Sequence, residues 1–405
     1  MPHWVTSWTG SVQGPYPTGN PSAQPDLRFA LPDQGARDQT FRLNVRPSFW
    51  GEQARLRLSN AFGTRPIAFD DIHAGLQRSG SVVEPGTNRP VNFSGKAAVT
   101  VQPGQWVWSD PFAVAPATIG RRLTVSLHVA GESGPMTWHA KALTTSYMTA
   151  PGAGAIGASD GVLGFPYSTT SWFFLDAVDM AAPAGTRLVV GFGDSITDGT
   201  GTTLNGDDRW PDVLLHRLLA RGITDIAIAN AGIGGNQVLG PADDAQPFPG
   251  GPSALDRMER DLLSLSGVTH VIWLEGTNDF GGAGNASVQA VIDGMSRGAA
   301  RIRSAVPGVR IIGATVASAL GSPNPGHGDA GQDAKRRMLN AFIRESDLFD
   351  GVADFDRATL DPATGRLRPE FVPDSTIGGP GDGLHPNRAG YQAMAGAIDL
   401  DVLLG

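Results

Sequence analysis

Leu188-Val189-Val190-Gly191-Phe192-Gly193-Asp194-Ser195 is the stretch that decides the fold of the C-terminal half of the chain. Its first five residues are apolar without interruption, which is typical of a strand covered on both faces, as in a parallel sheet. Three further runs, 226–228, 271–274 and 309–313, have a similar character. Helical periodicity lies between them, and this alternation predicts a doubly wound, mostly parallel α/β domain.

Five helices are expected between and after these strands, over 210–220, 253–265, 287–306, 333–346 and 389–398. Polar residues follow three of the strands directly: Asp194-Ser195, the run 230–236 and the run 275–279. The carboxyl ends of parallel strands meet at one edge of a sheet, where such folds bind ligands. The three polar runs are therefore expected to share one site.

The first 185 residues have a different pattern. Apolar and polar side chains alternate in 41–46, 55–58 and 122–129. This period of two predicts strands with one buried and one solvated face. Turn signals separate the strands, so we expect an antiparallel, jelly-roll-like β-sandwich domain over 1–185. Pro183-Ala184-Gly185 is the expected hinge to the α/β domain over 186–405.

The overall composition excludes several classes of partner and cofactor. The formal net charge is −8 and no basic stripe is present, which makes nucleic acid and anionic membranes poor partners. The chain has no cysteine, so disulfides and thiolate metal sites are excluded. Since no apolar run approaches about 18 residues, no membrane span is expected. The eight histidines form no metal-ligand motif, so no metal is expected.

The first eight residues, Met1 to Trp8, lack the basic and apolar regions of a secretion signal. The sequence as written therefore predicts no signal peptide. This leaves two compartments open, the cytoplasm for the chain as it stands and the exterior if a leader has been removed.

Three residues have the types needed for nucleophilic catalysis. A serine hydroxyl is a weak nucleophile until a base removes its proton. Ser195 is the candidate nucleophile, His385 the candidate base and Asp382 the candidate group that orients the histidine. Because Asp382 and His385 are only three residues apart, one tight turn is able to place both side chains on the same side.

Two other strand ends offer hydrogen-bond donors for a developing oxyanion. Acyl transfer builds negative charge on a carbonyl oxygen, and preorganised donors at that point lower the barrier. The backbone N–H groups of Ser195 and Gly235 and the side-chain amide of Asn278 are the expected donors. Asp279 is expected to be structural, and Asp194 and Asp198 to cap or bind neighbouring loops.

Four stretches resemble, in order, the signature blocks of the SGNH (GDSL-type) hydrolases: Gly193-Asp194-Ser195-Ile196-Thr197, the turn at Gly235, Gly276-Thr277-Asn278-Asp279 and Asp382-Gly383-Leu384-His385-Pro386. The resemblance covers about residues 190–405. It implies Ser195 as nucleophile, Asp382 and His385 as the rest of a triad, and Gly235 and Asn278 as oxyanion donors. The stretches 209–212, 230–236, 274–276 and 58–63 further resemble a bacterial arylesterase and acylhydrolase subgroup with an N-terminal β domain.

The resemblance implies a serine ester hydrolase that works through an acyl-enzyme without a cofactor. Loops 240–251, 321–331 and 370–381 are rich in small and hinge-like residues and show no long apolar channel. We therefore expect a short-acyl substrate, an acetyl or aryl ester, as a small molecule or on a glycan. His327 lies in the second of these loops, from which it is able to overhang the site.

Two alternatives stay open. One is an esterase of phospholipids or other lipids. The other is a carbohydrate-binding protein with a vestigial hydrolase domain, in which tryptophans of the first domain stack on sugars. The tryptophans concerned are Trp50, Trp106, Trp108, Trp138 and Trp172. The natural ester, the oligomeric state and any approach of the first domain to the site are left open as well.

Overall fold

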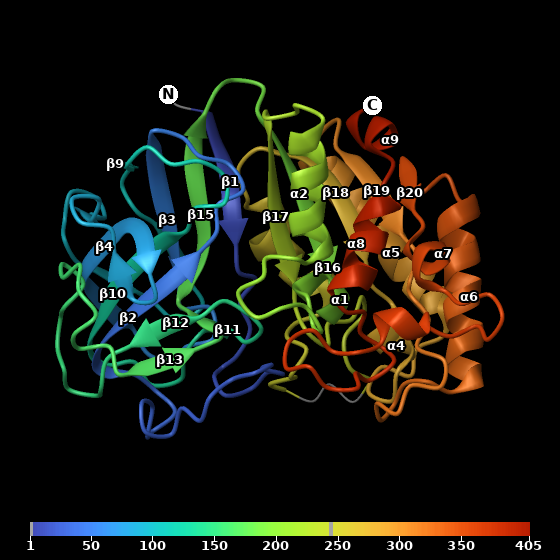
Figure 1. The fold of residues 1–405 in the computed structure, drawn as a ribbon, viewed down its shortest axis with the longest axis horizontal. Helices are drawn as coiled ribbons and strands as arrows, with labels where there is room; N and C mark the ends of the chain where they lie inside the picture. Colours follow the sequence, from blue (N-terminus) through green and yellow to red (C-terminus); the bar gives the residue numbers. More distant parts are fainter. Residues whose placement is uncertain (1–2, 243–245) are drawn as a thin grey trace. The chain divides into compact units, whose positions relative to one another are not determined.

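A computed structural model describes residues 3–242 and 246–405 of the chain. The chain divides into two compact units, Met1–Thr186 and Arg187–Gly405. Figure 1 shows the first unit in blue to green and the second in green to red. Each unit is described by itself below.

The described part of the first unit consists of strands and their connections, without a helix. The strands are β1 (His3–Thr9), β2 (Arg37–Val45), β3 (Gln53–Ser59), β4 (Ile67–Ser79), β5 (Val82–Val83), β6 (Arg89–Pro90), β7 (Val99–Val101), β8 (Trp106–Trp108), β9 (Phe112–Ala113), β10 (Leu123–Glu132), β11 (Trp138–His139), β12 (Ser146–Met148), β13 (Tyr167–Thr169), β14 (Trp172–Phe173) and β15 (Leu175–Ala182).

Two larger sheets make up most of this unit, and their strands pair antiparallel. One has the order β1-β15-β3-β8, with β9 added to β3. The other has the order β13-β12-β2-β10-β4-β5, with β6 and β7 added to β4. Apolar side chains from both sheets, among them Leu56, Val178, Phe41 and Val125, belong to one core. The N-terminal region is therefore an antiparallel β structure.

The polar faces of the central strands are buried, so the expectation that they are solvated is wrong. Arg42 on β2 is 0% exposed and His128 on β10 is 5% exposed. The Arg42 guanidinium donates to the carbonyl oxygens of Ser81, Ser159 and Gly161 at 2.8, 2.5 and 2.9 Å. Two of these carbonyls belong to the connection between β12 and β13. Because these carbonyl oxygens accept hydrogen bonds from the guanidinium, the free-energy cost of burying its charge is reduced.

The tryptophans considered as a sugar-stacking surface have different surroundings. Trp138 and Trp172 belong to the buried core. Trp106 and Trp108 on β8 lie near the guanidinium of Arg57, which is 5.7 and 5.5 Å from their ring centroids. Trp106 is 37% exposed. The core pair is unavailable for sugar stacking, and a sugar platform on β8 stays a prediction.

The second unit has one parallel sheet, with the order β17-β16-β18-β19-β20. Its strands are β16 (Arg187–Gly193), β17 (Ile226–Gly232), β18 (Val268–Leu274), β19 (Arg310–Ala314) and β20 (Gly351–Ala353). The chain leaves β16 for β17 on one side and then crosses to β18 on the other. The carboxyl end of β16 is therefore the topological switch point, where open α/β sheets bind ligands.

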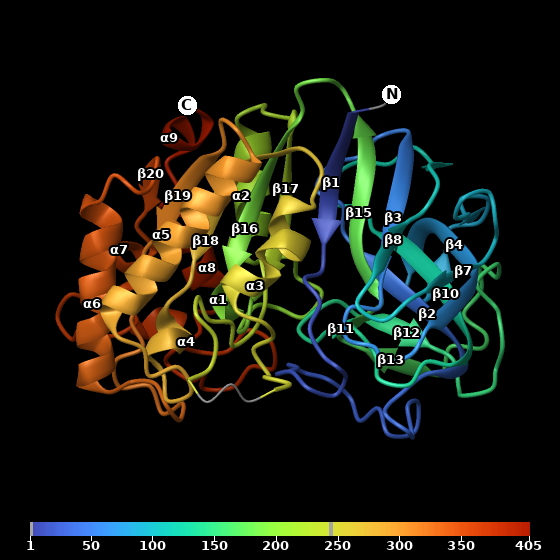
Figure 2. The ribbon, with the colours of Figure 1, turned by 180° about the vertical axis from the view of Figure 1, so that it is seen from behind.

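The helices of this unit are α1 (Ser195–Asp198), α2 (Trp210–Ala220), α3 (Ala254–Met258), α4 (Thr277–Phe280), α5 (Val288–Ala305), α6 (Ala330–Glu345), α7 (Phe355–Thr359), α8 (Arg388–Gly396) and α9 (Leu400–Leu404), with a π-helical turn at Glu259–Leu263 and a 3₁₀ turn at Pro369–Phe371. Helices α2 and α8 lie in front of the sheet in Figure 1. Helices α3 and α5 lie in front of it in Figure 2, which shows the opposite side. The sheet is thus covered on both faces.

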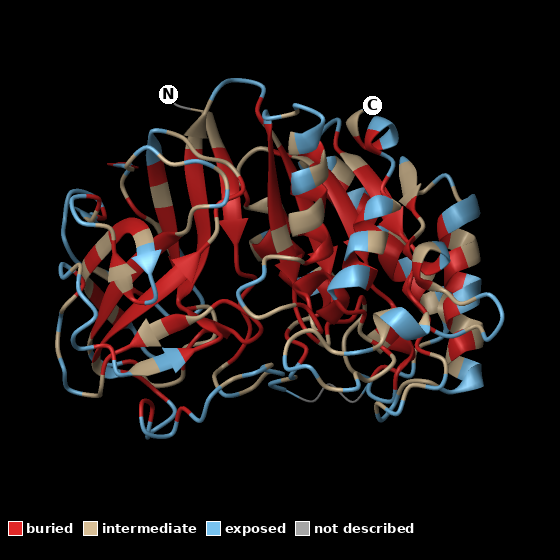
Figure 3. Ribbon diagram, in the orientation of Figure 1, coloured by how far each residue is buried: buried red, intermediate tan, exposed pale blue. Residues whose placement is uncertain are grey.

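Burial follows these layers. Figure 3 shows the strands of the second unit almost entirely buried, while the helices alternate between buried and exposed surface along their length. This explains why the strands are apolar without alternation and the helices are amphipathic. Over residues 3–242 and 246–405, the structure contains no helix that combines the length and the apolar character of a membrane span.

Candidate active site

Ser195 lies directly after β16, at the switch point of the sheet. It is 4% exposed and begins the short helix α1. The Asp194 carboxylate caps this helix by accepting a hydrogen bond from the Ile196 N–H at 2.9 Å. A side chain at Gly193 would collide with the Leu274 carbonyl oxygen and with Thr197. The glycine therefore allows the tight passage from strand to helix that presents Ser195 at the strand end.

Ser195, His385 and Asp382 form one hydrogen-bonded chain of side chains. The Ser195 Oγ is 2.8 Å from His385 Nε2. The other ring nitrogen of His385, Nδ1, is 2.6 Å from Asp382 Oδ2. Both nitrogens of the imidazole are therefore engaged, one by the hydroxyl and one by the carboxylate. This is the arrangement in which a histidine is able to accept a proton from a serine.

The turn that carries Asp382 and His385 orients its own carboxylate. Asp382 Oδ1 accepts hydrogen bonds from the backbone N–H groups of Leu384 at 3.0 Å and His385 at 2.9 Å. Gly383 between them has a φ of 68°, which favours glycine. Burial alone would raise the pKa of Asp382, but the hydrogen bonds from His385 and the backbone hold that pKa well below its usual range. The carboxylate is thus ionised at neutral pH.

The expected oxyanion donors lie on two loops that contact each other. Gly235 has a φ of 84° in the turn after β17. The preceding residue, Gly234, donates its N–H to Asp198 Oδ2 at 2.8 Å. The Asn278 side-chain amide donates to the Asn236 carbonyl at 2.9 Å. An amide NH₂ has two protons to donate, so this contact orients Asn278 and still leaves one N–H for a ligand.

Asp279 is hydrogen-bonded to the backbone of the loop that follows β17. Its two carboxyl oxygens accept the N–H groups of Val238 at 2.9 Å and Leu239 at 3.0 Å. The residue is 0% exposed. Burial, with a smaller contribution from nearby Glu275, raises the pKa of Asp279 to about 7. Asp279 therefore acts on the loop, as a structural residue.

Arg257 on α3 is a buried residue that contacts several segments near the site. The sequence patterns did not identify it. Its guanidinium donates to the carbonyls of Gly193 and Ala231, each at 2.8 Å, and to Asn236 Oδ1 at 2.7 Å. It thereby joins the ends of β16 and β17 to the Gly235 turn. Two buried acidic residues lie within ion-pair distance of it, Asp261 at 3.2 Å and Glu275 at 3.5 Å. Helical periodicity places Arg257 on a helix but does not reveal that its side chain points inward.

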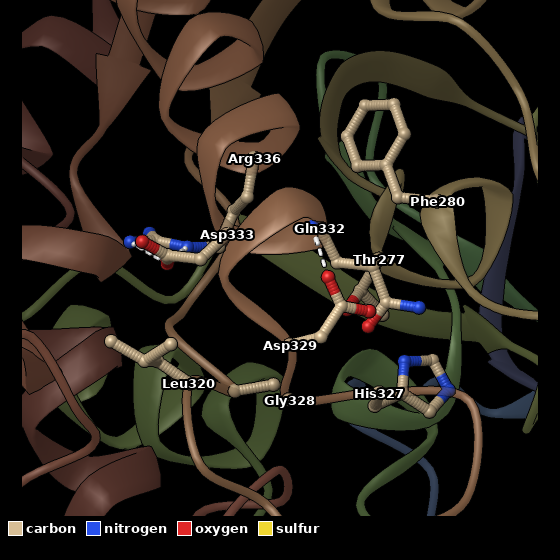
Figure 4. A pocket seen from close by; sticks show the side chains of 10 residues that line it. Thr277, Phe280, Leu320, His327, Gly328, Asp329, Gln332, Asp333 and Arg336 are labelled. Atoms are coloured by element: carbon tan, nitrogen blue, oxygen red, sulfur yellow. Dashed lines mark hydrogen bonds and ion pairs between the residues drawn. The ribbon is translucent and has the colours of Figure 1, made fainter.

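A small cavity lies beside α4, the helix that contains Asn278. It measures about 20 Å³. Its lining residues are Thr277, Phe280, Ala319, Leu320, His327, Gly328, Asp329, Gln332, Asp333 and Arg336. Figure 4 shows Thr277 and His327 together on one side of this cavity and the Asp333–Arg336 ion pair on another. Burial and the nearby His385 lower the pKa of His327, so its ring is neutral at neutral pH.

A second hollow, of about 190 Å³, lies at the turn of Asp382, which is itself one of the lining residues. Gly321, Pro323, Arg366, Val372 and Gly383 are among the residues that line it. For metals, no group of three or more histidine or acidic residues with suitable placement occurs in the described ranges 3–242 and 246–405.

Comparison with known proteins gives a family for the second unit. The model of the GDSL-like lipase/acylhydrolase family matches residues 192–393. No curated protein matches the chain.

Solved structures match about half of the chain. Est24, a carbohydrate acetylesterase from Sinorhizobium meliloti, is 16% identical, with 52% of this chain and 96% of that protein covered and a TM-score of 0.39. The aryl esterase of M. smegmatis is 17% identical, with 54% and 99% covered and a TM-score of 0.41. A lipase/acylhydrolase from Enterococcus faecalis is 21% identical, with 52% and 93% covered and a TM-score of 0.39.

Proposed function

The chain belongs, through residues 192–393, to the GDSL-like lipase/acylhydrolase family and is a carboxylic ester hydrolase, and on this premise we propose that Ser195, His385 and Asp382 are its catalytic triad. The observation that carries the assignment is the hydrogen-bonded chain from the Ser195 hydroxyl through both nitrogens of His385 to the Asp382 carboxylate. It joins a nucleophile, a base and an orienting acid at one strand end.

The first half of the reaction transfers the acyl group to the enzyme. Ser195 Oγ attacks the ester carbonyl carbon while its proton passes to His385 Nε2. Asp382 keeps its negative charge and stabilises the imidazolium that results. The tetrahedral intermediate then collapses, and the C–O bond to the alcohol breaks. The alcohol leaves with the proton from Nε2, and Ser195 carries the acyl group as an ester.

The second half releases the acid. A water molecule gives one proton to His385 Nε2 as its oxygen attacks the acyl-enzyme carbonyl. When the second tetrahedral intermediate collapses, Ser195 Oγ recovers that proton and the carboxylic acid departs. In both halves, the N–H groups of Ser195 and Gly235 and the Asn278 amide would stabilise the oxyanion. Loss of one such donor typically lowers kcat by about 10²–10³-fold.

Replacement of Ser195 tests the proposal directly. Ser195→Ala and His385→Ala are each expected to lower kcat on p-nitrophenyl acetate by at least about 10³-fold, because neither leaves an activated nucleophile. Ser296→Ala is the matched control, since that hydroxyl donates back along its own helix to the Ile292 carbonyl at 2.8 Å. Wild-type turnover in Ser195→Ala would refute the assignment.

We further propose a short acyl group, such as acetyl. The support is the sequence of loops 240–251, 321–331 and 370–381, which are rich in small and hinge-like residues. For the alcohol portion we propose a sugar or an aryl alcohol, on the resemblance of the sequence motifs alone.

A series of p-nitrophenyl esters tests acyl length. We expect kcat/KM to be highest for two to four carbons and to fall steadily for longer chains. A maximum at ten carbons or beyond would instead support the lipid esterase. A wild-type protein that binds glycans but hydrolyses no ester of a broad panel would support the carbohydrate-binding alternative.

A further inference from the structure

The connection between β19 and α6 reaches the catalytic turn from a distant part of the chain. We propose that Asn324 in this connection is a positioning residue for Asp382, and thus a fourth member of the chain of side chains that ends at Ser195. The inference rests on the proposed function, because it assigns Asn324 a role in the same proton transfer.

Asn324 contacts the carboxylate oxygen that faces the histidine. Its Nδ2 donates to Asp382 Oδ2 at 3.3 Å. The same oxygen is 2.6 Å from His385 Nδ1. The other carboxylate oxygen, Oδ1, accepts two backbone N–H groups of its own turn. Among the described residues, each oxygen therefore has two donors, and Asn324 is the donor that lies outside the turn.

Ser322 fastens the same connection to the backbone of the turn. Its hydroxyl donates to the Asp382 carbonyl oxygen at 2.5 Å. The Ser322 Oγ in turn accepts the backbone N–H of Asn324 at 3.1 Å. The Asn324 carbonyl accepts the N–H of His327 at 3.1 Å. The connection thus holds both the main chain and the side chain of Asp382, with Ser322 placing the Asn324 amide.

The physical consequence is control of the plane of the carboxylate. Backbone donors fix Oδ1, whereas Oδ2 binds the His385 ring, a side chain that is able to turn together with the carboxylate. A donor on Oδ2 restrains that rotation and keeps the lone pair directed at His385 Nδ1. The Asp382 side chain is 34% exposed, so water would replace the amide if it were removed. Water restores a hydrogen bond but does not fix its direction.

A purely structural role for Asn324 is distinguishable by kinetics. If the amide only supported the loop, its loss would lower stability and affect KM through the nearby cavity. If it orients Asp382, its loss lowers kcat at unchanged KM, and a charge in its place shifts the acid limb of the pH profile of kcat/KM. That profile reports the essential acid and base groups of the free enzyme.

The experiment compares Asn324→Ala, Asn324→Asp and the control Pro325→Ala, an exposed position of the same connection. For Asn324→Ala we expect kcat to fall about 10-fold with KM within about twofold. The isosteric Asn324→Asp places a second carboxylate beside Asp382, which favours the imidazolium. In this variant the acid limb of the pH profile of kcat/KM should move upward by about one pH unit. Pro325→Ala should match the wild type in both measurements.

The outcomes separate the two proposals. If Asn324→Ala keeps wild-type kcat and Asn324→Asp keeps the wild-type acid limb, Asn324 has no positioning role. Ser195→Ala and His385→Ala are assayed alongside. If those two variants stay active, the proposed function fails. If they are inactive while both Asn324 variants behave like the wild type, only this inference is overturned. Thermal unfolding of every variant excludes loss of fold as the cause of a lower kcat.

Discussion

Two aspartates of the second unit show how surroundings decide the charge of one residue type. Asp382 is held by its histidine, by backbone N–H groups and by Asn324, and its pKa lies well below the usual range. Asp279 also accepts two N–H groups, yet its complete burial raises its pKa to about 7. Hydrogen bonds favour the carboxylate and desolvation disfavours it, and the balance differs between the two sites. The partly solvated residue is the one proposed for catalysis.

The raised pKa of Asp279 predicts a pH-dependent stability. An aspartate in the unfolded chain titrates near 3.9. Between about pH 4 and pH 7 the folded protein therefore holds a proton that the unfolded chain has lost. The stabilisation linked to this proton decreases as the pH rises and is gone above about pH 7. This stabilisation is at most about 4 kcal/mol, because a difference of one pKa unit between the folded and unfolded states corresponds to about 1.36 kcal/mol.

Thermal unfolding between pH 5 and pH 8 measures this effect. Relative to Asp279→Asn, which does not titrate, the wild-type midpoint should decline as the pH rises. Asp293→Asn on an exposed part of α5 is the control, and its curve should run parallel to the wild type. Parallel curves for wild type and Asp279→Asn would show that Asp279 does not titrate in this range.

At the scale of elements, the turn after β17 depends on side chains from three other segments. Asp198 of α1 accepts the Gly234 N–H, Asp279 of α4 holds the residues after the turn, and Arg257 of α3 binds Asn236. The turn itself contains Gly235 in a left-handed conformation. A loop that is fastened at both ends presents its N–H groups in a fixed direction, which is what an oxyanion site requires.

Gly235→Ala tests this turn against a matched glycine. Gly235 and Gly222 have φ angles of 84° and 75°, and Gly222 lies just after α2 with open space around it. An alanine at a left-handed position costs about 1–2 kcal/mol, so both variants should lose similar stability. Only Gly235→Ala should lose kcat, by about 10-fold or more, because its N–H shifts. Equal kcat in both variants would remove Gly235 from the oxyanion site.

At the scale of the whole molecule, every residue proposed for catalysis belongs to Arg187–Gly405. The assignment of 1–185 and 186–405 as separate domains stays a prediction, and a fragment tests it. Isolated residues 187–405 should fold and hydrolyse p-nitrophenyl acetate with kcat/KM within about 10-fold of the full chain. Circular dichroism establishes that the fragment is folded. A folded fragment that has lost more than about 100-fold would mean that the first unit takes part in the reaction.

The sequence by itself determined what depends on neighbouring residues. An uninterrupted apolar strand followed by Gly193 and Ser195 specifies a buried strand with a tight exit, through burial and backbone sterics. The spacing of Asp382 and His385 permits one turn to align both side chains. The resemblance to family motifs pointed to Gly235 and Asn278, and both follow strand ends, as Ser195 does. That shared placement was enough to group these three residues into one candidate site.

Only the tertiary structure decided the partners of buried polar groups. Period-two alternation predicted a solvated face for β2 and β10, but a distant connection supplies hydrogen-bond acceptors for Arg42 of β2, and Asp70 of β4 binds His128 of β10. Arg257 and Asn324 have no distinguishing spacing, since their partners lie on other strands and loops. Whether a polar side chain meets water or another chain segment depends on long-range packing, and the cost of burial is removed only by partners that packing supplies.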